Sequence, residues 1–481
     1  MSMRSVSSCV FVKWLFLASI FTTGSFKELV SHECTFSFNF TFFLYSFLLM
    51  NTVLYTKFSF LRLSNVLPSH WLIYERKHFM LKKIMHTEDY LLVSRFKPAE
   101  RLKTIKASGI RRFFALAQKT PGIINLTVGE PDFAPPAHVL EAYSRAAKEG
   151  KTHYTPTNGI PELREALSQK VYQDYNLHYD PDTEMLITVG GTEAIFLALF
   201  SLVNLGDEVL IPNPGFVCYE PGVLLAGGVP VSFPLFEENG FKPSVENVTS
   251  LITKKSRVII LNYPNNPTGA VLSRDEAAAL AKIAVEHDLI VISDEVYEKI
   301  LYDELKHYCF ATFRGMRERT LIVNSFSKTY AMTGLRVGYV YGPKALVAPL
   351  WLTHQYTVAC VNTPAQYAAL AALNGPQDSV VNMVREFDRR RRLVHGRLNE
   401  IEGFACKLPK GAFYVFPNIK DFGMSSEEVA DFLVKESRVA TVPGSAFGSH
   451  GEGYLRISYA ASYEQLEEAL ARIEKAVKKH R

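Results

Sequence analysis

Seven short apolar runs between residues 185 and 341 constrain the fold of this chain more than any other feature. They are rich in β-branched residues and alternate with helix-like segments. The runs span residues 185–189, 208–211, 229–233, 258–261, 289–292, 321–323 and 336–341. Continuous apolar strands separated by helices are typical of a mostly parallel sheet with helices on both faces. The sequence therefore predicts an α/β domain around a seven-stranded, mostly parallel sheet.

The intervening helices have readable starts. Ser273 is followed three residues later by Glu276, which is the spacing of a capping box, ahead of a face rich in Ala and Leu. We therefore expect a helix to begin at this point.

After Gly342 the pattern changes to a mixture of helices and strands. We expect a long charged helix, strands at 412–416 and 454–459, a helix at 426–436 and a closing helix. The closing helix has one apolar face, formed by Leu466, Ala469, Leu470, Ile473, Ala476 and Val477. The run Arg389–Arg392 on the long helix is typical of a solvated face. We expect this segment to form a smaller α+β domain.

The first 95 residues differ in kind from the rest. They are rich in Phe and contain an uncharged run of the length that crosses a bilayer as a helix, at 35–56. Polar residues interrupt this run, and no clear cleavage site follows it. Three readings stay open: a membrane anchor, a poorly ordered extension, and an upstream stretch outside the functional protein, which would then begin near Met80 or Met85.

The charge balance argues against nucleic acid as a partner. The chain has 481 residues, which is the length expected of a two-domain enzyme, and its formal net charge is +5. The first 95 residues hold ten Lys and Arg against five Asp and Glu, so the remainder is formally neutral. The six cysteines are scattered without the spacing of metal ligands, so no metal site is predicted.

Polar motifs follow four of the predicted strands. Gly190 follows one strand, Asn266 another and Asp294 a third, and Ser325 with Lys328 follows a fourth. Ligands of open α/β sheets gather beyond the carboxyl ends of the strands. These residues are therefore expected to meet in one site.

The motifs also occur in a recognisable order. Lys328 lies in Ser325–Lys328, Asn266 in Asn265–Gly269, Asp294 and Tyr297 in Ser293–Tyr297, and Arg456 in Tyr454–Ser458. From about Pro98 to the C-terminus the chain resembles the class I and II pyridoxal-phosphate-dependent aminotransferases of fold type I. It is similar in particular to the aromatic and aspartate aminotransferases of the archaeal and bacterial subgroup. We accordingly expect an extension (1–95), an arm with part of the small domain (96–130), a large cofactor-binding domain (131–344) and a small domain (345–481).

The resemblance implies pyridoxal 5′-phosphate as cofactor and assigns its ring contacts. Lys328 would form the Schiff base and shuttle the substrate proton, and Asp294 would pair with the protonated pyridine nitrogen. Tyr297 and Asn266 would hydrogen-bond the phenolic oxygen of the cofactor. Phe216 stands where the family places an aromatic ring on the pyridine. Lys328, Asp294 and Tyr297 are the expected catalytic residues.

The remaining assignments concern anions. The helix start after Gly190 offers free amides to a phosphate, and Arg336 offers a permanent charge. The phosphate ligands implied by the resemblance are Gly191, Thr192, Glu193, Ser325, Ser327, Arg336 and, from a neighbouring subunit, Tyr154. Arg456 would clamp the substrate α-carboxylate, assisted by Gly129 and Asn266. If Tyr154 acts across subunits, the protein is a homodimer with shared active sites.

The resulting expectation is a cytoplasmic enzyme that moves the amino group of an α-amino acid to a 2-oxo acid, with 2-oxoglutarate as the expected acceptor and an aromatic or aspartate-like donor. Two alternatives stay open. The same cofactor supports other reactions of amino acids, such as β-elimination by a lyase. A ligand-sensing regulator with an N-terminal DNA-binding domain is the remoter one, since residues 1–95 contain no capped helix pair with a polar recognition face.

Overall fold

A computed structural model describes residues 97–105 and 109–480. Contacts divide the chain after Lys97, and the unit from Pro98 onward carries everything described below. The extension, with the three readings of it, lies outside the described residues. Within the described part, no helix combines the length and the apolar character needed to cross a membrane.

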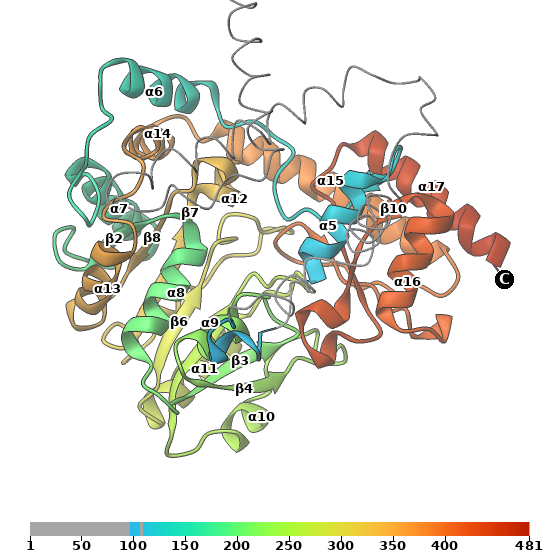
Figure 1. The fold of residues 1–481 in the computed structure, drawn as a ribbon, viewed down its shortest axis with the longest axis horizontal. Coiled ribbons are helices and arrows are strands. Elements are labelled where there is room, and N and C mark those ends of the chain that lie inside the picture. The colour runs from blue at the N-terminus through green and yellow to red at the C-terminus, as the bar shows by residue number, and fades with distance from the viewer. Residues whose placement is uncertain (1–96, 106–108, 481) are drawn as a thin grey trace, which may run out of the picture. The chain divides into compact units, whose positions relative to one another are not determined.

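The predicted seven-stranded sheet is confirmed (Figure 1). Its strands are β2 (Met185–Thr188), β3 (Glu208–Asn213), β4 (Val229–Pro234), β5 (Ser256–Asn262), β6 (Ile290–Asp294), β7 (Thr320–Ser325) and β8 (Gly338–Tyr341). They lie in the order β2-β8-β7-β6-β5-β3-β4. β8 runs antiparallel to both of its neighbours, whereas the pairs from β7 to β4 are parallel. The sheet is therefore mostly parallel, as its continuous apolar strands predicted.

Helices cover the sheet and extend its core. They are α6 (Ala137–Lys148), α7 (Pro161–Tyr175), α8 (Gly190–Leu202), α9 (Tyr219–Leu225), α10 (Val245–Ser250), α11 (Arg274–Glu286), α12 (Phe326–Thr329), α13 (Lys344–Thr357) and α14 (Thr363–Asn374). α8 lies along β6, β7 and β8, with α13 packed against it, while α14 packs on α6 and α7. α11 begins with the predicted capping box of Ser273 and Glu276. The helices α13 and α14 thus pack with the large sheet and its helices.

A second core forms around two small sheets. The strands are β1 (Ile124–Asn125) with β10 (Val439–Ala440), and β11 (Val442–Pro443), β12 (Leu455–Ser458) and β9 (Tyr414–Val415). Its helices are α5 (Gly109–Lys119), α15 (Asp378–Glu400), α16 (Ser426–Phe432), which continues as a π-helical turn to Ser437, and α17 (Tyr463–His480). The six apolar residues predicted for the closing helix are all buried. That amphipathic face therefore packs into the core as expected.

The prediction of a solvated face for Arg389–Arg392 is wrong for two of the four residues. Arg390 and Arg391 are 5% and 0% exposed. Arg391 donates to both carboxylate oxygens of Asp303, at 2.8 and 3.0 Å, and Arg390 donates to Asp132 at 2.7 Å. A run of arginines in a sequence suggests a solvent-exposed face when no acidic partners for them can be identified. Here acidic residues distant in sequence allow the guanidinium groups to be buried as paired ions.

Candidate active site

A cavity of about 260 Å³ lies beyond the carboxyl ends of β2, β5, β6 and β7. Parallel strands end at the same edge of the sheet, so residues that follow them meet there. The cavity is lined by twelve of the predicted site residues: Gly129, Gly191, Thr192, Phe216, Asn266, Asp294, Tyr297, Ser325, Ser327, Lys328, Arg336 and Arg456. The structure therefore brings together groups spread over more than half of the described chain.

Lys328 lies on the short helix α12, directly after β7. The hydroxyl of Ser325 accepts a hydrogen bond from the amide of Ser327 at 3.0 Å and so caps this turn. The Nζ atom of Lys328 donates to the carbonyl oxygen of Gly129 at 2.5 Å. Burial, helped by the nearby Arg456, lowers the pKa of Lys328 to about 8. A lysine with this pKa supplies a neutral amine near neutral pH, which nucleophilic and base chemistry require.

Asp294 is the last residue of β6 and is 3% exposed. Burial raises the pKa of its carboxyl group to about 6, although the hydroxyl of Tyr219 donates to it at 2.7 Å. Among the described residues Asp294 makes no ion pair. A buried carboxylate without a cation is costly. The site therefore fits a ligand that brings a protonated ring nitrogen to this position.

The start of α8 forms an anion cradle. Gly190 has φ +77°, and a Cβ atom there would lie 2.4 Å from a terminal nitrogen of Arg336. Only glycine lets the guanidinium approach the first turn of the helix this closely. The hydroxyl of Ser325 donates to that of Ser327 at 2.8 Å beside the cradle. Free amides at a helix start, hydroxyl groups and a guanidinium suit a phosphate group.

Arg456 lies on β12 and is 2% exposed. Its terminal nitrogens donate to the side-chain oxygen of Asn266 at 3.1 Å and to the carbonyl of Thr127 at 2.7 Å. Its Nε atom is buried and has no hydrogen-bond partner among the described residues. Burial lowers the pKa of the Arg456 guanidinium, which indicates a cation that still lacks its counter-ion. A carboxylate entering the cavity would supply both the charge and the missing acceptor.

Two predicted residues lie outside this lining. The carboxylate of Glu193 accepts from the amide of Val189 at 2.5 Å and contacts Nδ1 of His354 at 3.1 Å. It therefore closes the turn that leads into α8 rather than facing the cavity. Tyr154 is 89% exposed, so no described residue of its own chain fixes its side chain in the site.

The sequence reading missed several lining residues, among them Ile110, Asn262 and Tyr414. It also missed Tyr219, which acts on the site through Asp294. The missed residues carry no motif. Tyr414 stands between Phe413 and Val415 in an apolar run, where an aromatic residue reads as core. Its position in the cavity lining is evident only once β9 is known to pair with β12.

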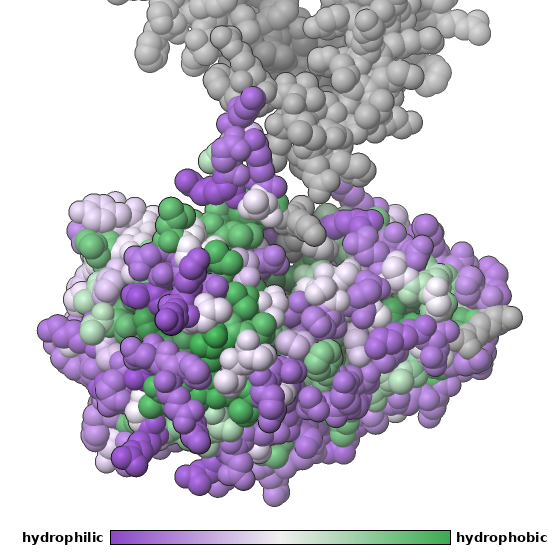
Figure 2. Space-filling view, turned by 90° about the horizontal axis from the view of Figure 1, so that it is seen from below, coloured by the Kyte–Doolittle hydropathy of each residue, from purple (hydrophilic) through white to green (hydrophobic). Residues whose placement is uncertain are grey.

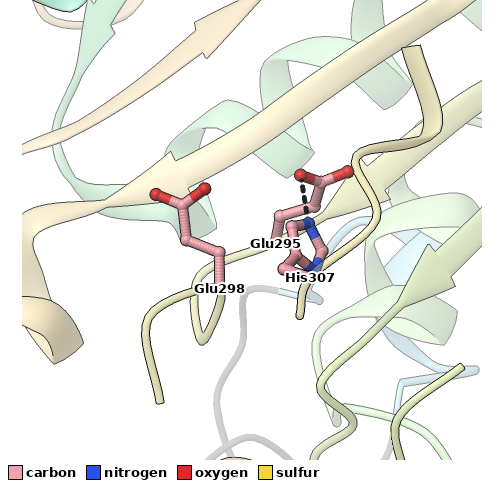
Figure 3. A group of neighbouring side chains, drawn as sticks. All are labelled: Glu295, Glu298 and His307. Atoms are coloured by element: carbon pink, nitrogen blue, oxygen red, sulfur yellow. Dashed lines mark hydrogen bonds and ion pairs between the residues drawn. The ribbon is translucent and has the colours of Figure 1, made fainter. Parts of the chain in front are cut away.

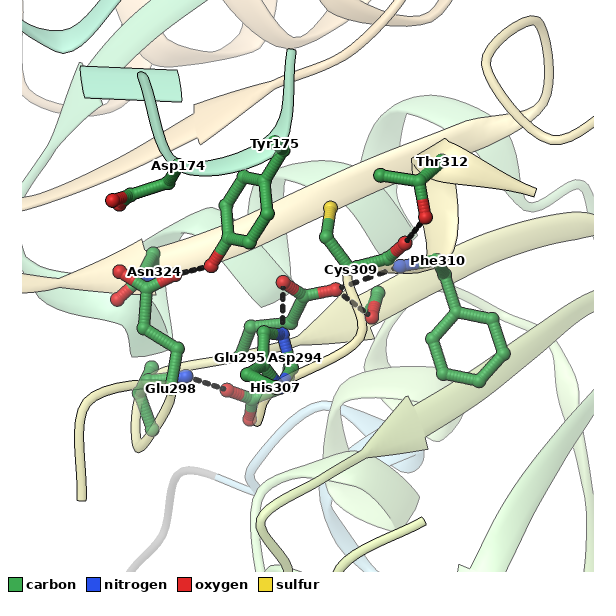
Figure 4. A network of polar contacts seen from close by, with 12 residues as sticks. Asp174, Tyr175, Asp294, Glu295, Glu298, His307, Cys309, Phe310, Thr312 and Asn324 are labelled. Atoms are coloured by element: carbon green, nitrogen blue, oxygen red, sulfur yellow. Dashed lines mark hydrogen bonds and ion pairs between the residues drawn. The ribbon is translucent and has the colours of Figure 1, made fainter. Parts of the chain in front are cut away.

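A buried polar network lies next to the cavity, on the segment that follows Asp294 (Figures 3 and 4). The Glu295 carboxylate contacts Nε2 of His307 at 2.7 Å, while that of Glu298 accepts from Nζ of Lys170 at 2.6 Å and from the hydroxyl of Tyr175. The oxygens of both carboxylates are thus already bonded to protein groups, although Glu295, Glu298 and His307 lie close enough together to hold a cation.

The charges in this network reinforce one another. Burial would raise the pKa of Glu298, but Lys170 and its other cationic neighbours lower it to about 2. Burial would lower the pKa of His307, but Glu295 outweighs this and raises it above its ordinary value. The pair of Lys170 and Glu298 therefore joins the segment after β6 to α7, while the pair of His307 and Glu295 holds two parts of that segment together.

Comparisons with known proteins show which family the chain resembles. The pattern of the family described as aminotransferase class I and II matches residues 121–473. Aromatic-amino-acid aminotransferase 2 of Thermococcus litoralis is 48% identical over 382 residues, which are 79% of this chain and 98% of that protein. The aspartate aminotransferase of Pyrococcus abyssi is 47% identical with the same coverage.

Solved structures agree as well. The crystal structure of the aromatic aminotransferase from Pyrococcus horikoshii OT3 superposes with a TM-score of 0.73 at 46% identity, covering 77% of this chain and 99% of that one. The aspartate aminotransferase from Thermus thermophilus with maleate gives a TM-score of 0.76 at 37% identity, covering 79% and 100%.

Proposed function

The chain belongs to the class I and II aminotransferases, and we propose that it holds its cofactor on Lys328 and transfers amino groups from aromatic amino acids to 2-oxoglutarate. It is a pyridoxal-phosphate-dependent enzyme whose substrates are amino acids and 2-oxo acids. The observation that carries the residue assignment is one cavity shared by a lysine of lowered pKa, a buried carboxylate and a buried arginine, the last two without an ion partner among the described residues.

The residues of this cavity divide the work of holding the cofactor. Bound pyridoxal phosphate supplies an electron sink that weakens the Cα–H bond of an amino acid. Asp294 would keep the ring nitrogen protonated, because a buried carboxylate is stabilised by a cation at that point. Tyr297 and Asn266 would donate hydrogen bonds to the phenolic oxygen. Phe216 would cover one face of the ring, and the cradle at the start of α8 with Arg336 would hold the phosphate.

Lys328 is the proposed base. With its pKa lowered to about 8, the Nζ atom is neutral in an appreciable fraction of molecules at neutral pH and can accept a proton from the Cα atom of the substrate. The carbonyl of Gly129 receives a hydrogen bond from Nζ and so holds the amine toward the loop that we propose meets the substrate carboxylate. This orientation favours proton transfer within a short distance.

The lining favours an aromatic donor. The three cations of the described lining are Lys328, Arg336 and Arg456, and each already has a proposed role. Ile110, Phe216 and Tyr414 add apolar and aromatic surface, which suits an aromatic side chain better than a second carboxylate. A cation for the distal carboxylate of 2-oxoglutarate would then come from a second copy of the chain, from which Tyr154 is also proposed to reach the phosphate.

A direct test begins with the protein purified with its cofactor, starting near Met85. Borohydride reduction followed by peptide mapping should place the cofactor on Lys328. The enzyme should form glutamate from 2-oxoglutarate faster with an aromatic amino acid as the donor than with aspartate. Lys328→Ala should lose at least about a thousandfold in kcat, since it removes both the anchor and the base.

Other outcomes have defined meanings. A label on another lysine would overturn the assignment of Lys328. Release of ammonia without formation of an amino acid product would indicate a lyase instead of a transferase. A preference for aspartate would contradict the reading of the lining but not the reaction type.

A further inference from the structure

Tyr414 touches both ends of the cavity. It lies on β9, is 1% exposed and lines the cavity. Its hydroxyl lies 2.8 Å from the hydroxyl of Tyr297, and the guanidinium carbon of Arg456 lies 4.5 Å from the centre of its ring. One side chain thus contacts the residue proposed for the phenolic oxygen of the cofactor and the residue proposed for the substrate carboxylate.

The loop opposite leaves room for this hydroxyl. A Cβ atom at position 129 would lie 2.6 Å from the hydroxyl oxygen of Tyr414, so any residue other than glycine would displace it. The carbonyl of Gly129 is also the acceptor for Lys328. The close approach of Tyr414 is therefore built into the same loop that orients the proposed base.

The position of Arg456 favours one direction for the hydrogen bond between the two phenols. Its guanidinium carbon lies 4.5 Å from the centre of the Tyr414 ring, so the cation makes the hydroxyl of Tyr414 the better donor. Burial raises the pKa of both phenols, and Arg456 opposes this rise in each. With Tyr414 as the donor to Tyr297, the proton of Tyr297 is left for an acceptor inside the cavity.

We propose that Tyr414 is a positioning residue with two effects. It directs the proton of Tyr297 toward the cofactor, and it weakens the hydrogen bond that Tyr297 donates to the cofactor when a carboxylate binds Arg456. The proposal rests on the proposed roles of Lys328, Tyr297 and Arg456. A carboxylate neutralises the cation that lies over the ring of Tyr414, so the phenol becomes a weaker donor. Tyr297 then donates more weakly in turn, and the cofactor end of the cavity gains proton affinity when substrate arrives.

The test uses the holoenzyme and the pH at which the visible absorbance of its cofactor titrates. Tyr414→Phe keeps the ring and removes only the hydroxyl, and should raise this midpoint by about half a pH unit. In a Tyr297→Phe background the same substitution should change the midpoint little, since the group it acts through is gone. Tyr459→Phe is the matched control, because it removes a buried hydroxyl that bonds Tyr302 and the carbonyl of Ala412, away from the cavity lining.

A second arm adds 3-phenylpropionate, which has a carboxylate but no amino group to react. It should raise the midpoint of the wild-type enzyme. A smaller rise should remain in Tyr414→Phe, because the contact between Arg456 and Asn266 is still present. If Tyr414→Phe does not fold, Gly129→Ala should raise the midpoint in its place, because the added Cβ displaces the hydroxyl.

The outcomes separate this proposal from the one beneath it. An unchanged midpoint in Tyr414→Phe, or an equal change with and without the Tyr297 hydroxyl, would overturn the role of Tyr414 alone. Two results in the wild-type enzyme would together overturn both this role and the proposed function: a cofactor absorbance that does not titrate, and a borohydride reduction that does not label Lys328.

Discussion

At the scale of single residues, the site depends on one buried carboxylate whose charge is finely balanced. Asp294 has a pKa raised to about 6 by burial, and the hydrogen bond from Tyr219 opposes that rise. The carboxylate is therefore ionised at neutral pH by a small margin. Only the ionised form can pair with a protonated ring nitrogen, so cofactor affinity should fall as the pH falls through about 6.

Replacing Tyr219 by Phe should move this fall to higher pH. A hydrogen bond to a charged group contributes about 1.5 kcal/mol or more, and its loss raises the pKa of Asp294 by about one pH unit. The dissociation constant of pyridoxal phosphate from the apoenzyme, measured between about pH 5 and about pH 8, should show the shift. Tyr179→Phe is the control, because its buried hydroxyl has no partner among the described residues. An unshifted curve in Tyr219→Phe would contradict the proposed pairing.

At the scale of elements, the network after β6 fixes the segment that carries Tyr297. Glu298 is 4% exposed and bonds Lys170 and Tyr175, both on α7. This contact connects a segment beside the cavity to a helix on the sheet. A buried ion pair does not by itself add much stability, but removing one partner leaves an uncompensated charge.

Glu298→Gln should accordingly lower the free energy of unfolding in urea by about 3 kcal/mol. The loss should be largest while His307 is protonated and should become smaller as the pH rises through the raised pKa of His307, because the Glu298 carboxylate and the His307 cation attract each other. Since the pKa of Glu298 is lowered to about 2, its contribution is present above the ordinary carboxyl pKa and disappears only as the pH falls through about 2. Glu286→Gln breaks the exposed pair with Lys282 and should cost less than about 0.5 kcal/mol. Equal losses in the two variants would contradict a buried role for Glu298.

The elements also show what a sequence can and cannot predict. The strands of the large sheet and the face of α17 were predictable because apolar periodicity is a local signal. The residues at the strand ends were predictable because they lie in motifs. Tyr414 and Tyr219 were not, because each works through a contact with a residue distant in sequence. The buried Arg391 was misread for the same reason, since its partner Asp303 lies 88 positions earlier.

At the scale of the whole molecule, one loop carries an aromatic side chain that the described part of its own chain leaves exposed. Tyr154 is 89% exposed, but the residues on either side of it are held: Thr363 donates to the carbonyl of His153 at 2.8 Å, and Gln366 to the hydroxyl of Thr155 at 3.1 Å. An exposed aromatic residue on a fixed loop suits contact with another molecule.

Other exposed apolar side chains also suggest contact with another molecule. Large ones lie on α13 and α8, at Leu352, Tyr356 and Phe200. Figure 2 shows a largely hydrophilic surface with apolar side chains gathered in one area. Closed, twofold dimers are the commonest way in which chains of this kind cover such surface. We therefore propose that Tyr154 reaches the phosphate cradle of a second copy.

A mixture of two inactive variants tests this proposal. Lys328→Ala and Tyr154→Ala should each have low activity, but a mixed dimer has one site with both native groups. Random exchange should therefore restore about a quarter of wild-type activity per chain, because half of the dimers are mixed and each holds one intact site. Lys328→Ala mixed with Asp294→Ala is the control, since both residues lie in one chain's cavity and no intact site can form. No recovery despite verified subunit exchange, or a fully active monomer in sedimentation, would place Tyr154 outside any shared site.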